Sequence, residues 1–210
     1  MSEEFDQEYW EDRYRGRTAV WSGRPNSQLV AEAGDLTPGT ALDAGCGEGG
    51  DAVWLASRGW RVTAVDFATT ALSRAREHVE ALGDGIADRI DWVPADLTAW
   101  TPAAEHFDLV STHYVHVAAS RAALFRRLAA AVAPGGTLLI VGHHPSDLQT
   151  VPRPFAPELF FTAEEVAADL DPDRWDIVVA DARPRPAAGH ESHDGHEVTV
   201  HDAVLRARRR

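Results

Sequence analysis

The stretch Leu42–Asp51, which reads LDAGCGEGGD, decides the fold of this 210-residue chain. A short apolar strand, Thr40–Asp43, leads into it, and a helix over Asp51–Arg58 is expected to follow. Glycines at such a turn allow a tight bend and let a ligand approach the bare backbone at the carboxyl edge of a sheet. The stretch also satisfies the G-x-G-x-x-G pattern of dinucleotide-binding proteins from Gly45 to Gly50, which on its own is weak evidence.

Strands and helices alternate after the glycine stretch. Thr70–Leu82 carries apolar residues at a helical period, and Thr137–Val141 is wholly apolar, which is typical of a strand buried on both faces. The other elements expected in this region are the strands Arg61–Asp66, Ile90–Pro94 and Phe107–Thr112 and the helix Arg121–Val132, which ends before Pro134-Gly135-Gly136. This alternation over about 100 residues predicts right-handed crossovers and a parallel sheet.

Beyond Gly142 the pattern changes. The segment His143–Pro157 contains four prolines and is predicted to be a long loop. Thr162 is expected to cap a helix, and a glutamate three residues later completes a capping box. Trp175–Ala180 and Val198–Leu205 are β segments with no helix between them, so they should pair as an antiparallel hairpin at one edge of the sheet.

The composition excludes several classes of function. The formal net charge is −13, whereas proteins that bind nucleic acid gain most of their affinity from basic residues on phosphates, so a DNA or RNA partner is not expected. The one dense basic run, Arg206–Arg210, is interpreted as a solvated C-terminal tail. These features favour a small molecule as the substrate.

The sequence also predicts a cytoplasmic protein. The opening residues are acidic and polar, unlike a signal peptide, and no apolar run approaches the length of a membrane span, so no membrane partner is expected. Cys46 is the single cysteine, which excludes an intrachain disulfide and fits a reducing compartment.

Asp43 distinguishes between two kinds of ligand at the glycine stretch. A dinucleotide would place its anionic pyrophosphate there, where Asp43 and Glu48 would repel it. A ligand with an ammonium and a sulfonium group would be attracted instead. One charge pair at about 4 Å and an effective dielectric near 20 contributes about 4 kcal/mol. That energy favours the cationic ligand over the nicotinamide dinucleotide.

Two more acids stand where successive strands end. Asp66 lies 21 residues after Gly45 and can accept hydrogen bonds from both hydroxyls of a ribose. Phe67 beside it can pack on the face of an adenine, and Asp96 can receive the adenine amino group. Each acid alone has a plain structural role as a strand-end or helix-capping residue. All three around one glycine loop indicate a ligand site.

These motifs resemble, in their order, the series found in class I S-adenosylmethionine-dependent methyltransferases. The matching segments are Leu42–Asp51, Val65–Phe67, Pro94–Leu97, Phe107–Val110 and Ala133–Leu138. The resemblance implies an α/β, Rossmann-like three-layer sandwich whose sheet has seven mostly parallel strands and an antiparallel last strand. It implies S-adenosyl-L-methionine as the cofactor and S-adenosyl-L-homocysteine as its product. The expected cofactor-binding residues are Trp10, Trp21, Asp43, Ala44, Gly45, Cys46, Gly47, Gly49, Asp66, Phe67, Asp96, Leu97, Thr112 and His113.

The domain boundaries follow from this layout. Residues 1–210 are expected to form a single domain. Residues 1–35 form an N-terminal helical lid, with helices over Phe5–Tyr14 and from a cap at Ser27 to about Ala33. Residues 36–142 form the cofactor-binding core. Residues 143–210 contribute the substrate loop, a helix and the C-terminal β-hairpin.

A narrower likeness is to the thiopurine and tellurite-resistance methyltransferases. Trp10–Trp21 resembles the segment that covers the cofactor in that group, and Pro157–Phe161 is similar in layout to the tellurite-resistance type. In that type a histidine of the last hairpin lies near the methyl acceptor, and His190 is the matching residue. Glu191 stands where the group has a basic residue, which weighs against a chalcogen oxyanion as acceptor.

Methyl transfer needs little beyond alignment and exclusion of water, although an oxygen or nitrogen acceptor also needs a base, for which histidine is suited. The candidate catalytic residues are His190, His113 and His143, and no metal site is expected. The acceptor atom stays open between sulfur, nitrogen, oxygen and another chalcogen. Two other functions stay open as well: a nicotinamide-dependent reductase or epimerase, and a cofactor-binding module without catalysis.

Overall fold

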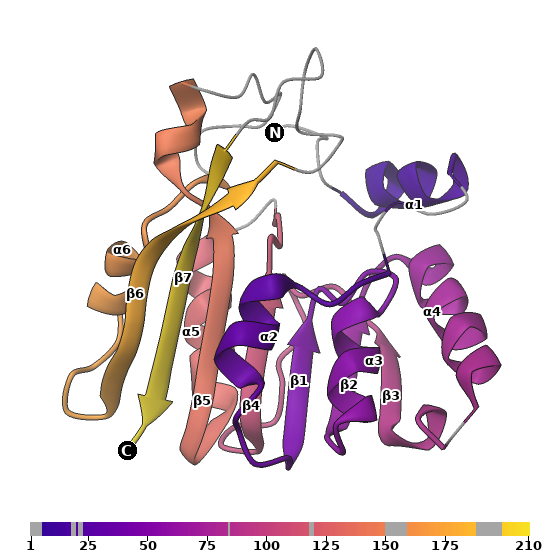
Figure 1. Cartoon of the computed structure of the whole chain (residues 1–210), viewed down its shortest axis with the longest axis horizontal. Helices are drawn as coiled ribbons and strands as arrows, with labels where there is room; N and C mark the ends of the chain where they lie inside the picture. The colour runs from indigo at the N-terminus through magenta and orange to yellow at the C-terminus, as the bar shows by residue number, and fades with distance from the viewer. Residues whose placement is uncertain are drawn as a thin grey trace.

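A seven-stranded sheet with the order β3-β2-β1-β4-β5-β7-β6 forms the centre of the molecule (Figure 1). The computed structural model describes residues 6–17, 20, 23–83, 85–117, 120–149, 159–187 and 199–210. The strands are β1 (Thr40–Ala44), β2 (Arg61–Asp66), β3 (Ile90–Pro94), β4 (Phe107–His113), β5 (Val132–His143), β6 (Trp175–Pro186) and β7 (Thr199–Arg209). The helices are α1 (Gln7–Arg15), α2 (Ser27–Ala33), α3 (Gly50–Ser57), α4 (Thr69–Leu82), α5 (Arg121–Ala131) and α6 (Ala163–Ala168), with the 3₁₀ turns η1 (Ala87–Arg89) and η2 (Pro145–Gln149).

The strand directions confirm the predicted fold class. Strands β1 to β5 pair in parallel, whereas β7 runs antiparallel to both of its neighbours, β5 and β6. The C-terminal pair is the predicted antiparallel hairpin, although both of its strands are longer than the sequence indicated. Carboxyl ends of parallel strands meet at one edge of a sheet, so the acids that follow β1 and β2 are brought together there.

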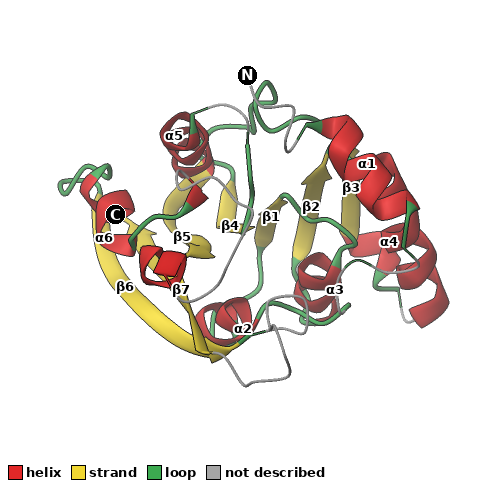
Figure 2. Ribbon diagram, turned by 90° about the horizontal axis from the view of Figure 1, so that it is seen from above, coloured by secondary structure: helices red, strands yellow, loops and turns green. Residues whose placement is uncertain are grey.

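Helices cover both faces of the sheet and complete three layers (Figure 2). Apolar residues of α2, α3 and α4 pack on one face, where Leu55 and Trp60 are buried. Those of α5 and α6 pack on the other, around Leu128 and Val166. Helix α1 lies apart from these layers, beside α4 (Figure 1). Among the described helices, none has the length and apolar character needed to cross a bilayer.

Two of the differences from the predicted element boundaries have a clear local cause. Strand β5 begins at Val132, before Pro134, because Val132 already pairs with Phe107 and the following residues bulge out before Thr137 pairs with Leu109. Gly135 has φ +81° within this bulge. Helix α2 is capped by the Asn26 side chain, which accepts a hydrogen bond from the Gln28 amide at 2.8 Å, so Ser27 is the first helical residue rather than the cap.

The basic run Arg206–Arg210 is not a solvated tail. Its first four residues belong to β7, between β5 and β6. The Arg209 side chain is 5% exposed, donates a hydrogen bond to the Val132 carbonyl and forms an ion pair with Glu105. The alternation of Arg with buried Leu205 and Ala207 is the pattern of a strand, which the charge of the run obscured.

Deleting residues 206–210 is therefore expected to destabilise the protein severely. The deletion removes ladder hydrogen bonds to both neighbours of β7, each contributing about 1 kcal/mol, together with the buried Arg209 contacts. Urea denaturation followed by circular dichroism measures the loss. The control Arg210→Ala removes only an exposed ion pair with Asp176 and should leave the midpoint nearly unchanged. A truncated chain as stable as the full chain would contradict this assignment.

Candidate cofactor and acceptor site

The glycine loop is held to the neighbouring strand by two backbone hydrogen bonds. The amides of Gly45 and Cys46 both donate to the Val65 carbonyl, at 2.8 and 3.0 Å. Gly45 (φ +83°) and Gly49 (φ +80°) adopt left-handed conformations that favour glycine. A side chain at Gly45 would also collide with Val115, beyond the end of β4. The sequence requirement for glycine here thus comes from both backbone conformation and close packing.

Asp43 lies fully inside the protein beneath this loop. Its side chain is 1% exposed, and Oδ2 has no hydrogen-bond partner among the described residues. Burial raises the pKa of Asp43 to about 8, and the nearby carboxylate of Asp51 adds to the increase. A buried carboxylate oxygen without a hydrogen-bond partner is rare in proteins, and contacts within the fold do not account for this one. Asp43 is therefore suited to a cationic group that approaches the loop.

His113 faces away from the acceptor side of the sheet. Its Nδ1 lies 2.8 Å from Oδ2 of Asp51, a residue in the first turn of α3. Burial lowers the pKa of His113, but Asp51 and then Asp43 raise it by more, so its net pKa lies above the usual value. Asp43, Asp51 and His113 form the one described group of potential metal ligands, with ligand atoms within 4.8 Å of one another.

Asp66 supports the glycine loop from the end of β2. Its Oδ2 accepts a hydrogen bond from the Gly47 amide at 2.9 Å, and its Oδ1 accepts one from the Ala68 amide at 2.8 Å. Burial raises the pKa of Asp66, while these amide hydrogen bonds lower it. Each carboxylate oxygen can accept a second hydrogen bond. The structure thus joins Asp66 to the loop, and its contact with a ribose stays a prediction.

The residues after β3 are oriented differently from one another. Asp96 is exposed and accepts hydrogen bonds from the amide and hydroxyl of Thr98, each at 2.7 Å, as in an Asx turn. The Leu97 side chain is buried in the core, and its carbonyl accepts a hydrogen bond from Arg127. Contact of either residue with an adenine stays a prediction.

Helix α1 is fastened over the cofactor side by a buried acid. Helix α4 begins after Ala68, which supplies no side-chain cap. Glu11 of α1 takes that role, because its Oε1 accepts hydrogen bonds from the Thr69 amide and hydroxyl at 2.6 and 2.8 Å. Trp10 and Tyr14 of α1 pack with Phe67 in a small apolar cluster. Trp10 and Phe67 both pack against the buried residues of this cluster, and their part in a cofactor lid stays a prediction. Trp21 lies outside the described residues.

Glu48 is paired with a basic residue, so it does not present the free charge expected from the sequence. Its Oε1 lies 2.9 Å from the Arg74 guanidinium in an ion pair, and its Oε2 accepts a hydrogen bond from the Val20 amide at 3.0 Å. The Arg74 charge compensates that of Glu48, so attraction of a cationic ligand depends on the acids at the strand ends rather than on Glu48.

Behind the glycine loop lie the side chains of Ala44, Cys46 and Thr112. All three are buried, and the Thr112 hydroxyl donates to the Ala44 carbonyl at 2.9 Å, which ties β4 to β1. Burial raises the pKa of the Cys46 thiol well above its usual value, so the thiolate that a nucleophile needs is suppressed. Cys46 can therefore contribute its backbone to a ligand but not nucleophilic chemistry.

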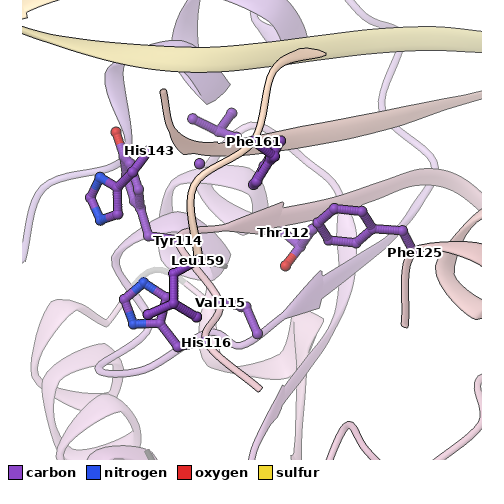
Figure 3. A pocket seen from close by; sticks show the side chains of 10 residues that line it. Thr112, Tyr114, Val115, His116, Phe125, His143, Leu159 and Phe161 are labelled. Carbon is purple, nitrogen blue, oxygen red and sulfur yellow. The ribbon is translucent and has the colours of Figure 1, made fainter. Parts of the chain in front are cut away.

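A pocket opens beside the loop at the ends of β4 and β5 (Figure 3). Its lining is largely apolar and aromatic, with two imidazoles: Thr112, Tyr114, Val115, His116, Phe125, Val141, Gly142, His143, Leu159 and Phe161. No arginine or carboxylate lines it in the part of the chain that the structure describes. Val115 both contacts Gly45 and lines this pocket, so the pocket adjoins the glycine loop.

Three rings of the pocket wall follow one another, and Trp10 of α1 continues the series beyond the wall. The centroid distances are 4.8 Å between Tyr114 and His143, 5.8 Å between His143 and His116, and 6.4 Å between His116 and Trp10 of α1. His143 therefore lies where the sequence predicted an acceptor-facing residue, although its catalytic role stays a prediction. His190 lies outside the described residues.

Tyr114 was not predicted as a site residue from the sequence, and His116 was not among the predicted catalytic residues. Both follow β4 in the run Thr112-His113-Tyr114-Val115-His116, and their position after a parallel strand was the available signal. His113 was predicted to be catalytic instead, because the sequence alone does not show which side of β4 each residue faces. His113 is not among the residues that line the pocket.

Comparisons with known proteins agree with this geometry. A family model described as "Methyltransferase domain" matches residues 41–136. Trans-aconitate 2-methyltransferase of Streptomyces coelicolor is 35% identical over 136 residues, which are 62% of this chain and 44% of that protein. Probable thiol methyltransferase 2 of Arabidopsis thaliana is 30% identical over 136 residues, 62% of this chain and 59% of that protein. The chain thus spans about half the length of the curated relatives it matches.

Solved structures match over nearly the whole chain. One, from work on "Conversion of a Disulfide Bond into a Thioacetal Group during Echinomycin Biosynthesis", has a TM-score of 0.71 and 27% identity, covering 97% of this chain and 91% of that one. TehB from Haemophilus influenzae has a TM-score of 0.69 and 20% identity, covering 97% and 67%. The second likeness concerns the fold alone.

The sheet order, with an antiparallel β7 and a glycine loop after β1, defines the class I methyltransferase fold. Residues 41–136 match a methyltransferase domain, and the chain has the class I methyltransferase fold. Two solved structures of similar fold, magnesium protoporphyrin IX methyltransferase from Synechocystis PCC 6803 and NodS from Bradyrhizobium japonicum, hold S-adenosylhomocysteine, the product of the methyl donor S-adenosylmethionine. The residues fit this cofactor, because the bare glycine loop, the unpaired Asp43 oxygen and Asp66 lie at one sheet edge.

Asp66→Ala is expected to weaken the binding of S-adenosylhomocysteine at least about tenfold, since a buried acid that accepts hydroxyl hydrogen bonds contributes about 1.5–3 kcal/mol. Calorimetric titration of the wild type and the variant measures the change. Asp91→Ala, at an exposed position of β3, is the control and should bind as the wild type does. Equal affinity in both variants would remove Asp66 from the ribose site.

Asp43 is expected to make the free protein less stable as the pH rises. Its pKa is raised from 3.8 to about 8, so over this range the folded chain holds a proton that the unfolded chain has lost. The stabilisation is complete below about pH 4 and is lost by about pH 8, at about 1.4 kcal/mol per unit. Urea denaturation should therefore show the wild type losing about 2 kcal/mol relative to Asp43→Asn between about pH 6.5 and 8. If the free energy of unfolding of the two proteins changed with pH in the same way, Asp43 would not be a buried, protonated carboxyl.

Proposed function

We propose that this chain transfers the methyl group of S-adenosylmethionine to a small, uncharged acceptor bound in the pocket at the ends of β4 and β5. The observation that carries the proposal is the shared wall at Val115, which contacts Gly45 of the cofactor loop and also lines the pocket. A cofactor held by the loop and an acceptor held in the pocket would therefore be neighbours. Proximity of this kind is the main requirement of methyl transfer.

The bound cofactor supplies a sulfonium methyl that is already activated. The chain's own residues orient the acceptor, exclude water and take up its proton. The apolar walls formed by Phe125, Leu159 and Phe161 suit the first two tasks. Burial and the nearby Asp202 carboxylate raise the pKa of Tyr114, which keeps its hydroxyl protonated. His143 and His116 are therefore the pocket groups suited to accept a proton.

The lining also favours a class of acceptor. The name of the Streptomyces coelicolor relative gives trans-aconitate as its acceptor. A polycarboxylate needs cationic partners, and the described lining offers none. An apolar molecule with one sulfur, nitrogen or oxygen nucleophile fits better, in keeping with the thiol in the name of the Arabidopsis relative. With a net charge of −13, we propose no nucleic acid or anionic membrane surface as a partner.

Two other functions are less well supported. A nicotinamide-dependent reductase would have the all-parallel 3-2-1-4-5-6 sheet of dinucleotide folds, whereas β7 here is antiparallel and lies between β5 and β6. A cofactor-binding module without catalysis would need no second pocket beside the loop. The pocket and its two imidazoles favour an enzyme.

A panel of benzyl mercaptan, catechol, benzylamine and trans-aconitate tests the proposal, with S-adenosylhomocysteine formation as the measurement. We expect turnover with an uncharged aromatic compound and none with trans-aconitate. His143→Asn and His116→Asn should each lower kcat about 100-fold or more for an oxygen or nitrogen acceptor. His78→Asn, at an exposed position of α4, is the control. Cofactor binding without turnover of any compound would indicate the non-catalytic module, and turnover of trans-aconitate would refute the uncharged acceptor.

A further inference from the structure

Asp202 of β7 is a buried acid with no part in the site described so far. It is fully buried and receives hydrogen bonds from three different elements or their ends. Gln28 of α2 donates from Nε2 at 3.1 Å, and Tyr114 after β4 donates from its hydroxyl at 2.7 Å. Arg185 of β6 donates from Nε to both oxygens, at 2.9 and 3.2 Å. A carboxylate with this many partners is fixed in place.

The hydrogen bond to Tyr114 holds an unfavourable backbone conformation. Tyr114 has φ +50°, and a bulky aromatic residue rarely adopts this left-handed region. Conformations of this kind persist only where surrounding contacts enforce them, and they are concentrated at functional sites. Besides the Asp202 carboxylate, the Arg185 guanidinium lies 5.6 Å from the centroid of the Tyr114 ring. The orientation of Tyr114 is thus set from β6 and β7.

Tyr114 in turn sets the position of the pocket imidazoles. Its ring and that of His143 are 4.8 Å apart and inclined by 33°, and His143 lies 5.8 Å from His116. All three side chains line the pocket (Figure 3), whereas Asp202 does not. A movement of Tyr114 would therefore change the wall that an acceptor contacts while leaving the glycine loop in place.

We propose that Asp202 is a positioning residue of the acceptor site, which acts through Tyr114 to fix His143 and His116 against the pocket. This inference rests on the proposed function of that pocket. It predicts that the network governs acceptor binding more than cofactor binding, because Asp202 meets the pocket wall through the Tyr114 hydroxyl and through its pairing with His143 in the sheet.

A double-mutant cycle of Asp202→Asn and Tyr114→Phe tests the inference. If Asp202 acts through Tyr114, each variant should raise KM for benzyl mercaptan about tenfold, and the double variant should raise it no further. In all three variants, kcat and the Kd of S-adenosylhomocysteine should stay within about twofold of the wild type. The ring proton signals of His143, assigned with His143→Asn, should shift in each variant.

Glu32→Gln is the matched control. Glu32 is also a buried acid of a network that joins α2 to β6 and β7, through Arg183 and Arg206, but none of its described contacts reaches the pocket wall. Its variant should lower the melting temperature without moving KM or the His143 signals. If Asp202 had a purely structural role, Asp202→Asn would likewise lower the melting temperature and leave KM and the His143 signals unchanged.

An unchanged KM and an unchanged His143 signal in Asp202→Asn would overturn the inference. So would a second full increase of KM in the double variant. A loss of S-adenosylhomocysteine affinity as large as the increase of KM would overturn it as well. If benzyl mercaptan is not methylated, the proposed function fails for that acceptor, while the His143 signals still decide the role of Asp202. If Asp202→Asn does not fold, Tyr114→Phe, which removes one hydroxyl, decides it alone.

Discussion

Two hydrogen bonds, from the amides of Gly45 and Cys46 to the Val65 carbonyl, are the contacts on which the site depends. They hold the glycine loop across the ends of β1 and β2, so Asp66 lies beneath the Gly47 amide. They also hold Gly45 against Val115, which places the acceptor pocket beside the loop. The parallel sheet makes this possible, because it ends its neighbouring strands at one edge.

The electrostatics of the site separate its two halves. On the cofactor side, the buried Asp43 and the partly buried Asp66 are acids whose pKa values are raised, so a cation that reaches them replaces a proton or relieves mutual repulsion. On the acceptor side, the charged groups lie behind the pocket wall, where the Arg185 guanidinium forms an ion pair with the Asp202 carboxylate. The lining itself is left neutral apart from its imidazoles. This separation suits a cationic donor and an uncharged acceptor.

The sequence predicted the elements whose evidence is local. The strands of the parallel core, the capping box at Thr162 and the C-terminal hairpin all follow from periodicity, capping chemistry and the lack of a helix. It did not predict contacts that need the folded chain: Glu11 capping α4 from another helix, or Asp202 meeting Tyr114 across 88 residues. The prediction of a solvated tail at Arg206–Arg210 was wrong, because it gave the charge of the run more weight than the alternation with buried residues that identifies a strand.

The order of strands at the β6 edge bears on how the chain reaches its native state. Strand β7 follows β6 in the sequence but lies between β5 and β6 in the sheet. On the ribosome, β5 and β6 therefore emerge before the strand that joins them, and both carry backbone donors and acceptors without their final partner. Such edges are prone to pair with other chains, so the interval before β7 inserts is the period of greatest aggregation risk for this protein.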